Sequence, residues 1–580
     1  MEDTVSFTKG SHNLKTGYRI IKDLVSPFTN TNTRGSLNFG LNFTDNPVDA
    51  SGGNGLADLL LGFLANGTSA GGSRGFLRTP YYLTVWEHAA FLQDDWKVSR
   101  RLTLNLGVRW DLFTPYTEER NRLTNFDMAN LRLVYAGVDG TSRTANVQTR
   151  WNNFSPHFGF AWDISGDGKT VVRGGFSSSY FPEQPSGSNF LGQAVPWTIS
   201  QNTPTTELYP LGSAMPSVPK INNPFGPPVP VQPTTTAQLI AANPSILGGS
   251  FTNQTPYYET WSFNVERQLG SSMLAELAYA GSHGVHLLYC YNPQEVEPGP
   301  SSIPSSLRVT IPAIAKLRTI TQCDPRNMSN YHGFQAKLVK RLSYGLSFLA
   351  SYTWSKSLDY GGSAASGGGA VGSPQTITDL RAGYGVSGFD IPQRFVGSWT
   401  YDLPFGPGRR FLTHGLLGNL IGGWELDGIA TIQSGLPFTV YMANCTNNAS
   451  SCWPDRTGSG TLSNPIYSHW YDPTAFEAPC AVAAVNGVCS QYAYRFGNSG
   501  RGILRAPGTY NFDFAASKSF SIKERFRVQF RVDAFNALNH PQLGFPNQNI
   551  NPTNPAKTST AITSTIGDNR DLQAAIKVLF

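Results

Sequence analysis

The sequence predicts an all-β protein, an antiparallel transmembrane β-barrel with short turns at one end and long loops at the other. Apolar and polar residues alternate with a period of two in segment after segment, which gives a strand one apolar and one polar face. Charged residues make up only 14% of the chain, against about a quarter in soluble domains, and aromatic residues reach 12%. Short and long connections between the predicted strands alternate, as they do in outer-membrane barrels.

The last ten residues show the alternation most clearly. Leu572, Ala574, Ile576, Val578 and Phe580 share one face, and mostly polar residues occupy the positions between them. A strand of about ten residues that ends on an aromatic can cross the apolar band of a bilayer and anchor at its interface. We therefore predict that these five residues form the C-terminal signal for barrel assembly.

Internal segments repeat the pattern. In 525–534, Arg525, Arg527 and Arg531 fall on the polar face, which would point into the water of a barrel lumen. In all, about sixteen strands are predicted, near 2–9, 11–21, 34–43, 80–97, 100–113, 153–165, 169–181, 256–269, 272–289, 329–342, 344–357, 389–403, 423–434, 508–521, 523–538 and 569–580.

The connections place the strand ends on opposite sides of a membrane. Short ones would be periplasmic turns and long ones extracellular loops, the latter near 114–152, 182–255, 290–328, 359–388, 435–507 and 539–568. The tight turn at Lys9–His12 conflicts with this order, because sixteen alternating strands would place it outside. One extra short strand within 67–78 would restore the alternation.

Composition excludes several other classes. No run approaches the roughly 18 apolar residues of a transmembrane helix, and the apolar run Leu56–Ala65 predicts a short helix packed on the barrel or a loop. The net charge of +6 is spread without a basic run, so we expect no nucleic-acid partner.

The six cysteines lie in or beside the predicted long loops. An even count in such loops favours disulfides and an oxidising compartment over a metal site, since no close CxxC pair is present. Cys445 with Cys452 and Cys480 with Cys489 are local pairs, and Cys290 and Cys323 bracket one loop. Fifteen pairings of six cysteines remain formally possible.

No motif predicts catalysis or a cofactor. Gly166–Thr170 (GDGKT) lacks the first glycine of a phosphate-binding loop, so a hairpin turn is the better interpretation. His283 and His286 have no third metal ligand nearby. Asp94 and Asp95 are adjacent in a strand and point to opposite faces, so they cannot act on one substrate.

Two groups of side chains leave alternatives open. Aromatic residues in the loops could stack on a sugar, but packing between loops or a place in the interface girdle is the simpler interpretation; they are Trp151, Trp453, Tyr467, Trp470, Tyr492 and Tyr494. The arginines of the polar face could attract anionic cargo or contact another domain in the lumen.

Several segments together resemble the barrel of TonB-dependent outer-membrane receptors, and the nearest branch is similar to the Oar-like receptors with a carboxypeptidase-regulatory-like domain. These segments are HNLKTGY (12–18), FLQDDWKVSRRLTLNLGVRWD (91–111), WSFNVERQL (261–269), AYAGSHGVHL (278–287) and VDAFNALNHP (532–541).

The resemblance implies a 22-stranded barrel, a plug domain in its lumen, and a TonB box that couples transport to the inner membrane. Here about 16–17 strands are predicted, and neither plug, TonB box nor signal peptide is found. We therefore expect residues 1–580 to be one receptor barrel domain, incomplete at its N-terminus. An open sheet in lipid leaves unpaired backbone groups, so the chain would close a smaller barrel or not function alone.

The resulting expectation is a receptor of the outer membrane of a Gram-negative-type bacterium, surrounded by lipid and folded by the barrel-assembly machinery. It would take up a metal chelate, an oligosaccharide or a peptide with energy from TonB, as a transporter rather than an enzyme. The alternatives are a plugless passive pore and a surface-binding or adhesion barrel.

Overall fold

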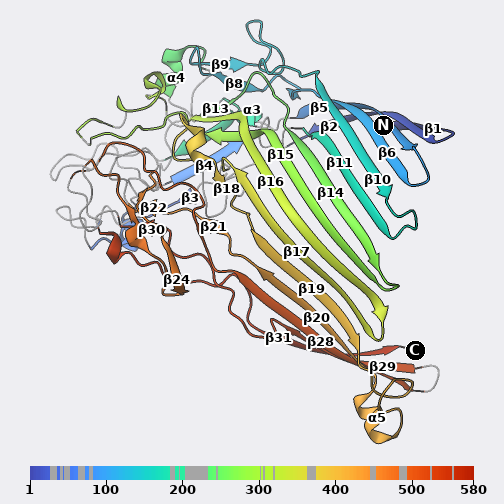
Figure 1. The fold of residues 1–580 in the computed structure, drawn as a ribbon. Coiled ribbons are helices and arrows are strands. Elements are labelled where there is room, and N and C mark those ends of the chain that lie inside the picture. Colours follow the sequence, from blue (N-terminus) through green and yellow to red (C-terminus); the bar gives the residue numbers. More distant parts are fainter. Residues whose placement is uncertain are drawn as a thin grey trace.

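One sheet of eighteen strands dominates the computed structural model, and almost all of its pairings are antiparallel (Figure 1). The structure describes residues 1–26, 36–39, 44, 52–62, 64, 72–77, 82–182, 190–194, 196–202, 233–242, 246–300, 302–304, 307–315, 317, 320–361, 374–443, 452–481, 491, 493–522, 526–551 and 554–579. Sequence neighbours pair along most of the sheet, and the strands run side by side across Figure 1.

Three of the eighteen strands are short and pair only near the long-loop end, which we call the outer end: β7 (Thr117–Glu118), β13 (Ile246–Gly249) and β18 (Gly385–Val386). The other fifteen form one continuous ladder. In ladder order they are β1 (Glu2–Lys9), β2 (His12–Val25), β5 (Leu83–Lys97), β6 (Leu102–Phe113), β10 (Asn153–Asp163), β11 (Thr170–Tyr180), β14 (Tyr257–Leu269), β15 (Met273–Tyr291), β16 (Ile320–Ser343), β17 (Leu346–Asp359), β19 (Gln393–Asp402), β20 (Trp424–Gln433), β28 (Thr509–Ile522), β29 (Phe526–Phe535) and β31 (Asp571–Leu579).

The ladder has two edges. Within the described residues β1 pairs only with β2, and β31 pairs only with β29. Figure 1 shows β1 and β31 at opposite ends of the sheet. The described strands therefore form an open, curved sheet whose two edge strands each have one unpaired side.

The register divides the side chains into two faces. On the polar face, Lys15 Nζ lies 3.0 Å from Asp95 Oδ2, and Arg173 Nη1 lies 2.7 Å from Glu266 Oε2, each pair bridging adjacent strands. The apolar face carries aromatic rings such as Trp399 and Phe512, whose centroids are 5.4 Å apart. A polar lumen face and an apolar lipid face are the two surfaces that a transmembrane barrel wall needs.

The remaining elements are small and lie mainly among the long loops. The helices are α1 (Gly55–Leu61), α3 (Phe190–Gln193), α4 (Thr236–Ala242) and α5 (Gly415–Ile421). The small sheets are β3 (Ser36–Leu37) with β4 (Gly72–Leu77) and β12 (Thr198–Asn202), β8 (Thr124–Asp127) with β9 (Arg132–Tyr135), β21 (Pro437–Phe438) with β27 (Leu504–Arg505), β22 (Tyr441–Met442) with β30 (Asn549–Ile550), β23 (Asp455–Arg456) with β26 (Phe476–Glu477), and β24 (Thr461–Ile466) with β25 (His469–Tyr471). Among the described residues, no helix has the length and apolar character to cross a membrane.

The ladder corrects one predicted strand. Fifteen of the sixteen predictions correspond to ladder strands, but 34–43 does not, because β2 pairs directly with β5 and leaves no place between them. Ser36–Leu37 instead pairs with β4 in a separate small sheet, so the strand expected within 67–78 also lies outside the ladder. Removing one strand, rather than adding one, puts the Lys9–His12 turn on the same side as the other short turns.

The helix predicted within Leu56–Ala65 is present as α1, with Asn54 as its N-cap. Its expected packing is only partly present among the described residues, since Leu64 of the same run is fully buried but the leucines of the helix are not. Leu56, Leu60 and Leu61 are exposed, and the buried side chain of the helix is Asp58.

A cross-strand pair on the apolar face generates a stability prediction. The Trp399 ring covers Gly428, its direct partner on β20, so closely that a Cβ at this glycine would overlap the ring. We expect Gly428→Val to force the ring away and destabilise the folded sheet by about 1–3 kcal/mol. Ala430→Val, on the same face of β20, is the matched control. The thermal midpoint of the gel-mobility shift between folded and unfolded protein measures both, and equal midpoints would contradict the packing described.

Candidate functional site

The long loops at the outer end build a layer with apolar cores of its own. We call the described residues of these loops, with the short strands beside them, the outer cap. Three buried clusters fill it, the first around Phe438, Tyr471 and Phe476, the second around Phe126 and Ile314, and the third around Leu83, Leu123 and Leu191. Because loops with buried cores hold a defined shape, the outer cap can present a binding surface.

Two arginines, the fully buried Arg501 and the partly exposed Arg505, fasten the outer cap to the sheet. The Arg501 side chain is fully buried and donates to Asp359 Oδ1 at 2.5 Å, at the end of β17, and to the Gly383 carbonyl at 2.9 Å. Arg505 donates to Asp390 Oδ2 at 2.5 Å and to the Gly435 carbonyl at 3.1 Å. Each guanidinium therefore joins segments more than a hundred residues apart to a single point.

Neutral side chains continue these links between loops. Gln375 Nε2 donates to the Gly497 carbonyl at 2.6 Å, and its Oε1 accepts from the Trp453 backbone at 3.1 Å. The Glu295 carboxylate accepts from Thr376 Oγ1 at 2.9 Å and from the backbone amide of Ile377 at 3.0 Å. The loops after β15, β17 and β20 are thereby held as one unit.

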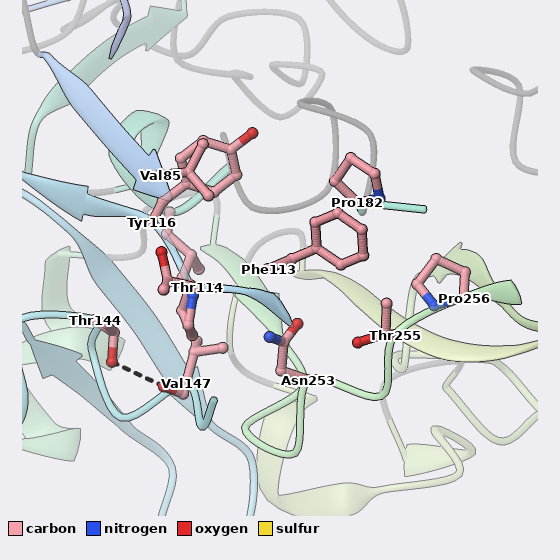
Figure 2. A pocket seen from close by; sticks show the side chains of 12 residues that line it. Val85, Phe113, Thr114, Tyr116, Thr144, Val147, Pro182, Asn253, Thr255 and Pro256 are labelled. Atoms are coloured by element: carbon pink, nitrogen blue, oxygen red, sulfur yellow. Dashed lines mark hydrogen bonds between the residues drawn. The ribbon is translucent and has the colours of Figure 1, made fainter. Parts of the chain in front are cut away.

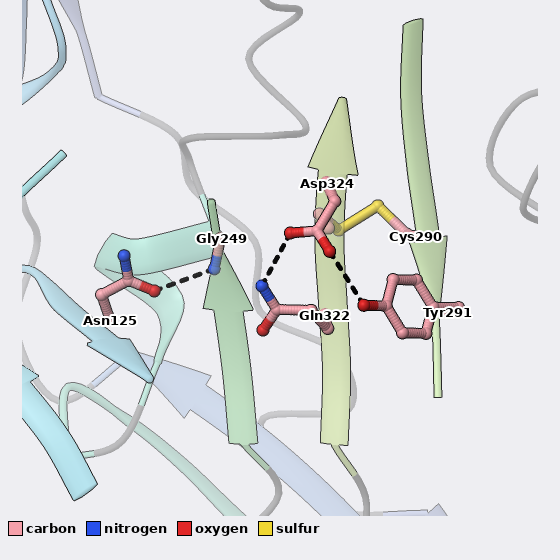
Figure 3. The surroundings of a disulfide bond; sticks show 7 residues. Asn125, Gly249, Cys290, Tyr291, Gln322 and Asp324 are labelled. Atoms are coloured by element: carbon pink, nitrogen blue, oxygen red, sulfur yellow. Dashed lines mark hydrogen bonds between the residues drawn. A yellow bond between two sulfur atoms is a disulfide. The ribbon is translucent and has the colours of Figure 1, made fainter. Parts of the chain in front are cut away.

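A disulfide closes the extension of β15 and β16 into the outer cap. Cys290 and Cys323 are direct partners across these two strands and are joined by the bond shown in Figure 3. Beside it, Asp324 Oδ2 accepts from the Tyr291 hydroxyl at 2.8 Å, and Asp324 Oδ1 accepts from Gln322 Nε2 at 2.9 Å. Burial and the Asp324 carboxylate raise the pKa of the Tyr291 hydroxyl, which therefore stays protonated and donates.

An open groove of about 460 Å³ lies next to this disulfide, and we call it the outer groove. Its lining residues are Phe126, Asp127, Met128, Ala129, Gly249, Ser250, Phe251, Thr252, Gln254, Gln322, Asp324, Pro325 and Arg326. Its charges are paired, since Arg326 Nη2 lies 3.2 Å from Asp324 Oδ2 and Arg132 Nε lies 3.8 Å from Asp127 Oδ2. Gln322 Oε1, by contrast, is buried and has no hydrogen-bond partner among the described residues.

This donor and acceptor inventory limits what the outer groove could hold. A free amide oxygen between paired charges suits a ligand that donates hydrogen bonds, and it offers little to a bare metal ion. Within the part of the chain that the structure describes, no group of three His, Cys, Asp or Glu side chains could hold a metal.

Two further cavities lie where β5 and β6 reach the outer end of the sheet. One, of about 270 Å³, is on the polar face and is lined by Arg19, Glu87, Arg109 and Asp111 among others. The other, shown in Figure 2, measures about 40 Å³ and is lined by uncharged residues such as Phe113, Tyr116 and Thr255. A cavity of that size holds a few waters at most, so we assign it to packing rather than to binding.

The structure separates the residue pairs that might imitate an active site. Asp94 lies 2.7 Å from His12 on one face, whereas Asp95 lies 3.0 Å from Lys15 on the other, as predicted for adjacent strand residues. His283 Nδ1 is 2.7 Å from Asn330 Oδ1.

The GDGKT segment is a hairpin turn between β10 and β11. Asp163 Oδ1 accepts from the Gly166 amide at 2.8 Å, and Asp163 Oδ2 accepts from the Gly168 amide at 3.0 Å. Gly166 and Gly168 have φ values of 76° and 71°, which favour glycine. The prediction of a turn instead of a phosphate-binding loop is confirmed.

The loop aromatics have different environments. Trp453 is buried, and Trp470 Nε1 donates to the Arg505 carbonyl at 2.8 Å, so both pack the outer cap. Trp151, Tyr467 and Tyr494 are exposed, and Tyr492 lies outside the described residues. Loop packing thus accounts for two of the six, and stacking on a ligand stays open for the exposed rings.

The structure also tests part of the prediction that Arg525, Arg527 and Arg531 form a positively charged polar face. Arg531 Nη1 lies 3.2 Å from Asp427 Oδ2, and Arg531 Nε lies 2.8 Å from Asp533 Oδ1, so its charge is balanced within the sheet. Arg525 lies outside the described residues. The pairing of Arg531 removes part of the basis for an anion-attracting lumen.

The disulfide pairing of the other four cysteines is only partly described by the structure. Cys452 and Cys480 are both disulfide-bonded, whereas Cys445 and Cys489 lie outside the described residues. The local pairings Cys445–Cys452 and Cys480–Cys489 therefore stay predictions.

Sequence reasoning missed the arginines that fasten the outer cap. Arg501 and Arg505 stand four residues apart in the run GRGILRAPG, where apolar residues and glycine surround them. Because few residues of this chain are charged, two arginines within an apolar, glycine-containing run could have been interpreted as members of ion pairs in the folded protein. Their carboxylate partners, Asp359 and Asp390, are distant in sequence and could not be predicted.

A comparison with protein families decides the identity of the fold. The family model described as "Outer membrane beta barrel domain" matches residues 1–573.

The chain belongs to this family of outer membrane β-barrel domains.

With that assignment, the apolar face of the barrel faces lipid, the short turns are periplasmic and the outer cap is extracellular. The C-terminal strand β31 has the predicted alternation, and its side chains are exposed along its length.

The solved structures to which the chain is similar include those of three other proteins. They are the outer membrane transporter YddB from Escherichia coli (11% identity, TM-score 0.49), the ferripyoverdine receptor of Pseudomonas aeruginosa (12%, 0.43) and the FrpB iron transporter from Neisseria meningitidis (11%, 0.41). Each alignment covers 99% of this chain but only 52%, 47% and 54% of the other, so the chain spans about half of their length. The search among curated proteins found no match. The family assignment rests on the family model alone.

Arg501 gives the first prediction for the outer cap. Removing one partner of a buried ion pair leaves the other charge buried without a partner, which typically lowers the folding stability by about 3–5 kcal/mol. We expect Arg501→Met to open the outer cap to added protease on intact cells while the barrel wall stays folded. Arg456→Met is the control, because the exposed Arg456 side chain donates, among the described residues, to the carbonyls of Gly458 and Ser459 and to no carboxylate. Equal protease resistance in both variants would refute the fastening role.

Glu118 gives a prediction about pH. Burial by itself raises the pKa of this carboxylate. The hydrogen bonds that it accepts from Arg122, Arg120 and Tyr82 have the larger combined effect, so its pKa is lowered overall. Its contribution to stability is therefore complete above its unfolded pKa of about 4.3 and is lost as pH falls through the lower folded value.

We expect hydrogen exchange of segment 114–152 to accelerate as pH falls below about 4.3, after correction for the intrinsic rate. Glu118→Gln should flatten this dependence and raise exchange at neutral pH. Glu119→Gln is the matched control, since Glu119 is the exposed neighbour. A profile for Glu118→Gln that matched the wild type would show that this carboxylate does not hold the loop.

Proposed function

We propose that this barrel is part of a TonB-dependent receptor that imports a scarce nutrient across the outer membrane, from the Oar-like branch of such receptors. The observation that carries the proposal is the outer cap. Three cores, buried ion pairs and a disulfide fix the loops in one shape, over a sheet whose polar face leads from the outer groove toward the turns. A pore for passive diffusion has no need of loops fastened in this way.

The outer groove supports a cargo that offers hydrogen-bond donors. Metal chelates, oligosaccharides and peptides all meet this description, and the unpartnered Gln322 Oε1 would accept from any of them. The cavity lined by Arg19, Glu87 and Asp111 is a second contact on the polar face, further along the path.

The open edges support the expectation of an incomplete barrel. Each unpaired backbone group costs several kcal/mol in hydrocarbon, so β1 and β31 need partners in a membrane. We infer that strands outside residues 1–580 pair with both edges and close the barrel, and that a plug and a TonB box accompany them. The barrel-assembly machinery would act on the strand that ends at Phe580.

Uptake measurements in the native bacterium test the proposal. Deleting the gene should abolish high-affinity uptake of one labelled substrate class, and deleting TonB should abolish it equally, because transport draws energy through TonB. Uptake that persists without TonB would support the passive pore, and substrate binding without uptake would support the surface-binding barrel; either outcome overturns the proposal. In a planar bilayer the purified native protein should be almost silent, whereas a plugless pore would conduct.

A further inference from the structure

The connection between β19 and β20 differs from the other described turns at the periplasmic end. The turn between β1 and β2 has two residues, Gly10 and Ser11, and the turn between β16 and β17 also has two, Tyr344 and Gly345. The β19–β20 connection runs over 403–423 and contains α5. Figure 1 shows α5 projecting beyond the turn end of the sheet, on the side away from the outer cap.

Glycines dock α5 onto the segment before it. A Cβ at Gly418 would overlap the Leu412 carbonyl, and a Cβ at Gly422 would overlap Gly406. The Gly406 amide donates to the Phe411 carbonyl at 2.9 Å, which closes the preceding turn. The contact needs glycine on both sides, so the helix has a fixed orientation on its hairpin.

The opposite face of α5 is apolar and uncovered. Leu416 is 79% exposed, and Leu417, Leu420 and Ile421 are 61%, 60% and 40% exposed. At about 100° per residue these four side chains occupy one arc of roughly 140°, with Gly415 and Gly418 outside it. A water-facing turn has no reason to gather four large aliphatic residues in seven, so this face calls for an apolar partner.

The apolar face of α5 continues the lipid-facing surface of the barrel. Trp424 is separated from the helix only by Gly422 and Gly423 and lies on the apolar face of β20, and its Nε1 donates to the Leu420 carbonyl at 3.3 Å. Lys518, on the same face of β28, donates to this carbonyl at 2.6 Å and lies 4.9 Å from the ring centroid of Phe520. Trp, Phe and a lysine at a strand end are the residues that mark a membrane interface.

The charge of the hairpin fits a phospholipid surface. Residues 403–423 contain Arg409 and Arg410 but no carboxylate. Arg409 Nη2 is 3.0 Å from Asp402 Oδ2, whereas Arg410 is exposed beside the Phe411 ring, 5.3 Å from its centroid. A basic residue next to exposed apolar side chains is typical of segments that lie in the headgroup layer.

We propose that the α5 hairpin is a membrane-interface anchor. The leucine face inserts into the periplasmic leaflet of the outer membrane, and Arg410 lies at the lipid phosphates. The anchor fixes the β19–β20 end of the barrel wall at a set depth in the bilayer, and it is independent of the cargo and of TonB.

Fluorescence quenching in lipid vesicles tests the anchor. Single cysteines replace Leu416, Leu417 or Leu420 in the complete native protein, carry a bimane label, and are reconstituted with phosphatidylglycerol-containing vesicles. Arg100→Cys, in the short β5–β6 turn, is the control. We expect blue-shifted emission at the three helix positions, strong quenching by lipids with a nitroxide on the upper acyl chain, and weak quenching by iodide. The control should show the reverse.

Two results would overturn the proposal. Iodide quenching at the helix positions equal to that at position 100 would place α5 in water. Protection from both iodide and lipid nitroxides would mean that protein, such as a second copy or a periplasmic partner, covers the leucines. Because the label itself is apolar, Leu416→Asn combined with a label at Leu420 provides a second readout, in which lipid quenching should fall if Leu416 helps to hold the helix in the leaflet.

Discussion

Backbone amide and carbonyl groups inside a bilayer have no water to bond, so every strand that crosses the apolar band depends on a neighbour at each side. This constraint accounts for the ladder from β1 to β31, in which each strand bonds the next along its length. It also explains why no described strand lies between β2 and β5 in the ladder, since these two strands already bond one another. The two edges of the described sheet are the places where the constraint is unmet.

The same ladder sets the position of everything else. Strand pairing fixes which residues face lipid and which face the lumen, and the extended pair β15 and β16 carries the sheet beyond the membrane into the outer cap. In the outer cap the chain is in contact with water instead of lipid, so other interactions must stabilise it. Apolar clusters, a disulfide and the ion pairs of Arg501 and Arg505 replace the lipid as the environment that orders it.

The sequence was informative wherever one residue type repeats with a fixed period. Alternation located the ladder strands to within about four residues, except that β16 begins at Ile320, nine residues before its predicted start at 329. The glycines at 166 and 168 marked a turn correctly. It failed at 34–43, where alternation is present but the neighbouring strands pair without it. It also could not reach the outer cap, because the ion pair of Arg501 with Asp359 spans 142 positions and follows no period. The outer groove beside Gln322 depends on loops that meet only in three dimensions, so neither its place nor its free acceptor could be predicted.

The period-two alternation separates a lipid face from a water face along every ladder strand. Spin labels placed in turn from Leu426 to Ile432 on β20 test it, in the native protein reconstituted in lipid. Collision rates with oxygen should peak at Leu426, Ala430 and Ile432, and collision rates with a water-soluble nickel chelate should peak at Asp427, Ile429 and Thr431. If the two profiles rose and fell together, or if the chelate reached both faces equally, this strand would not form part of a membrane wall.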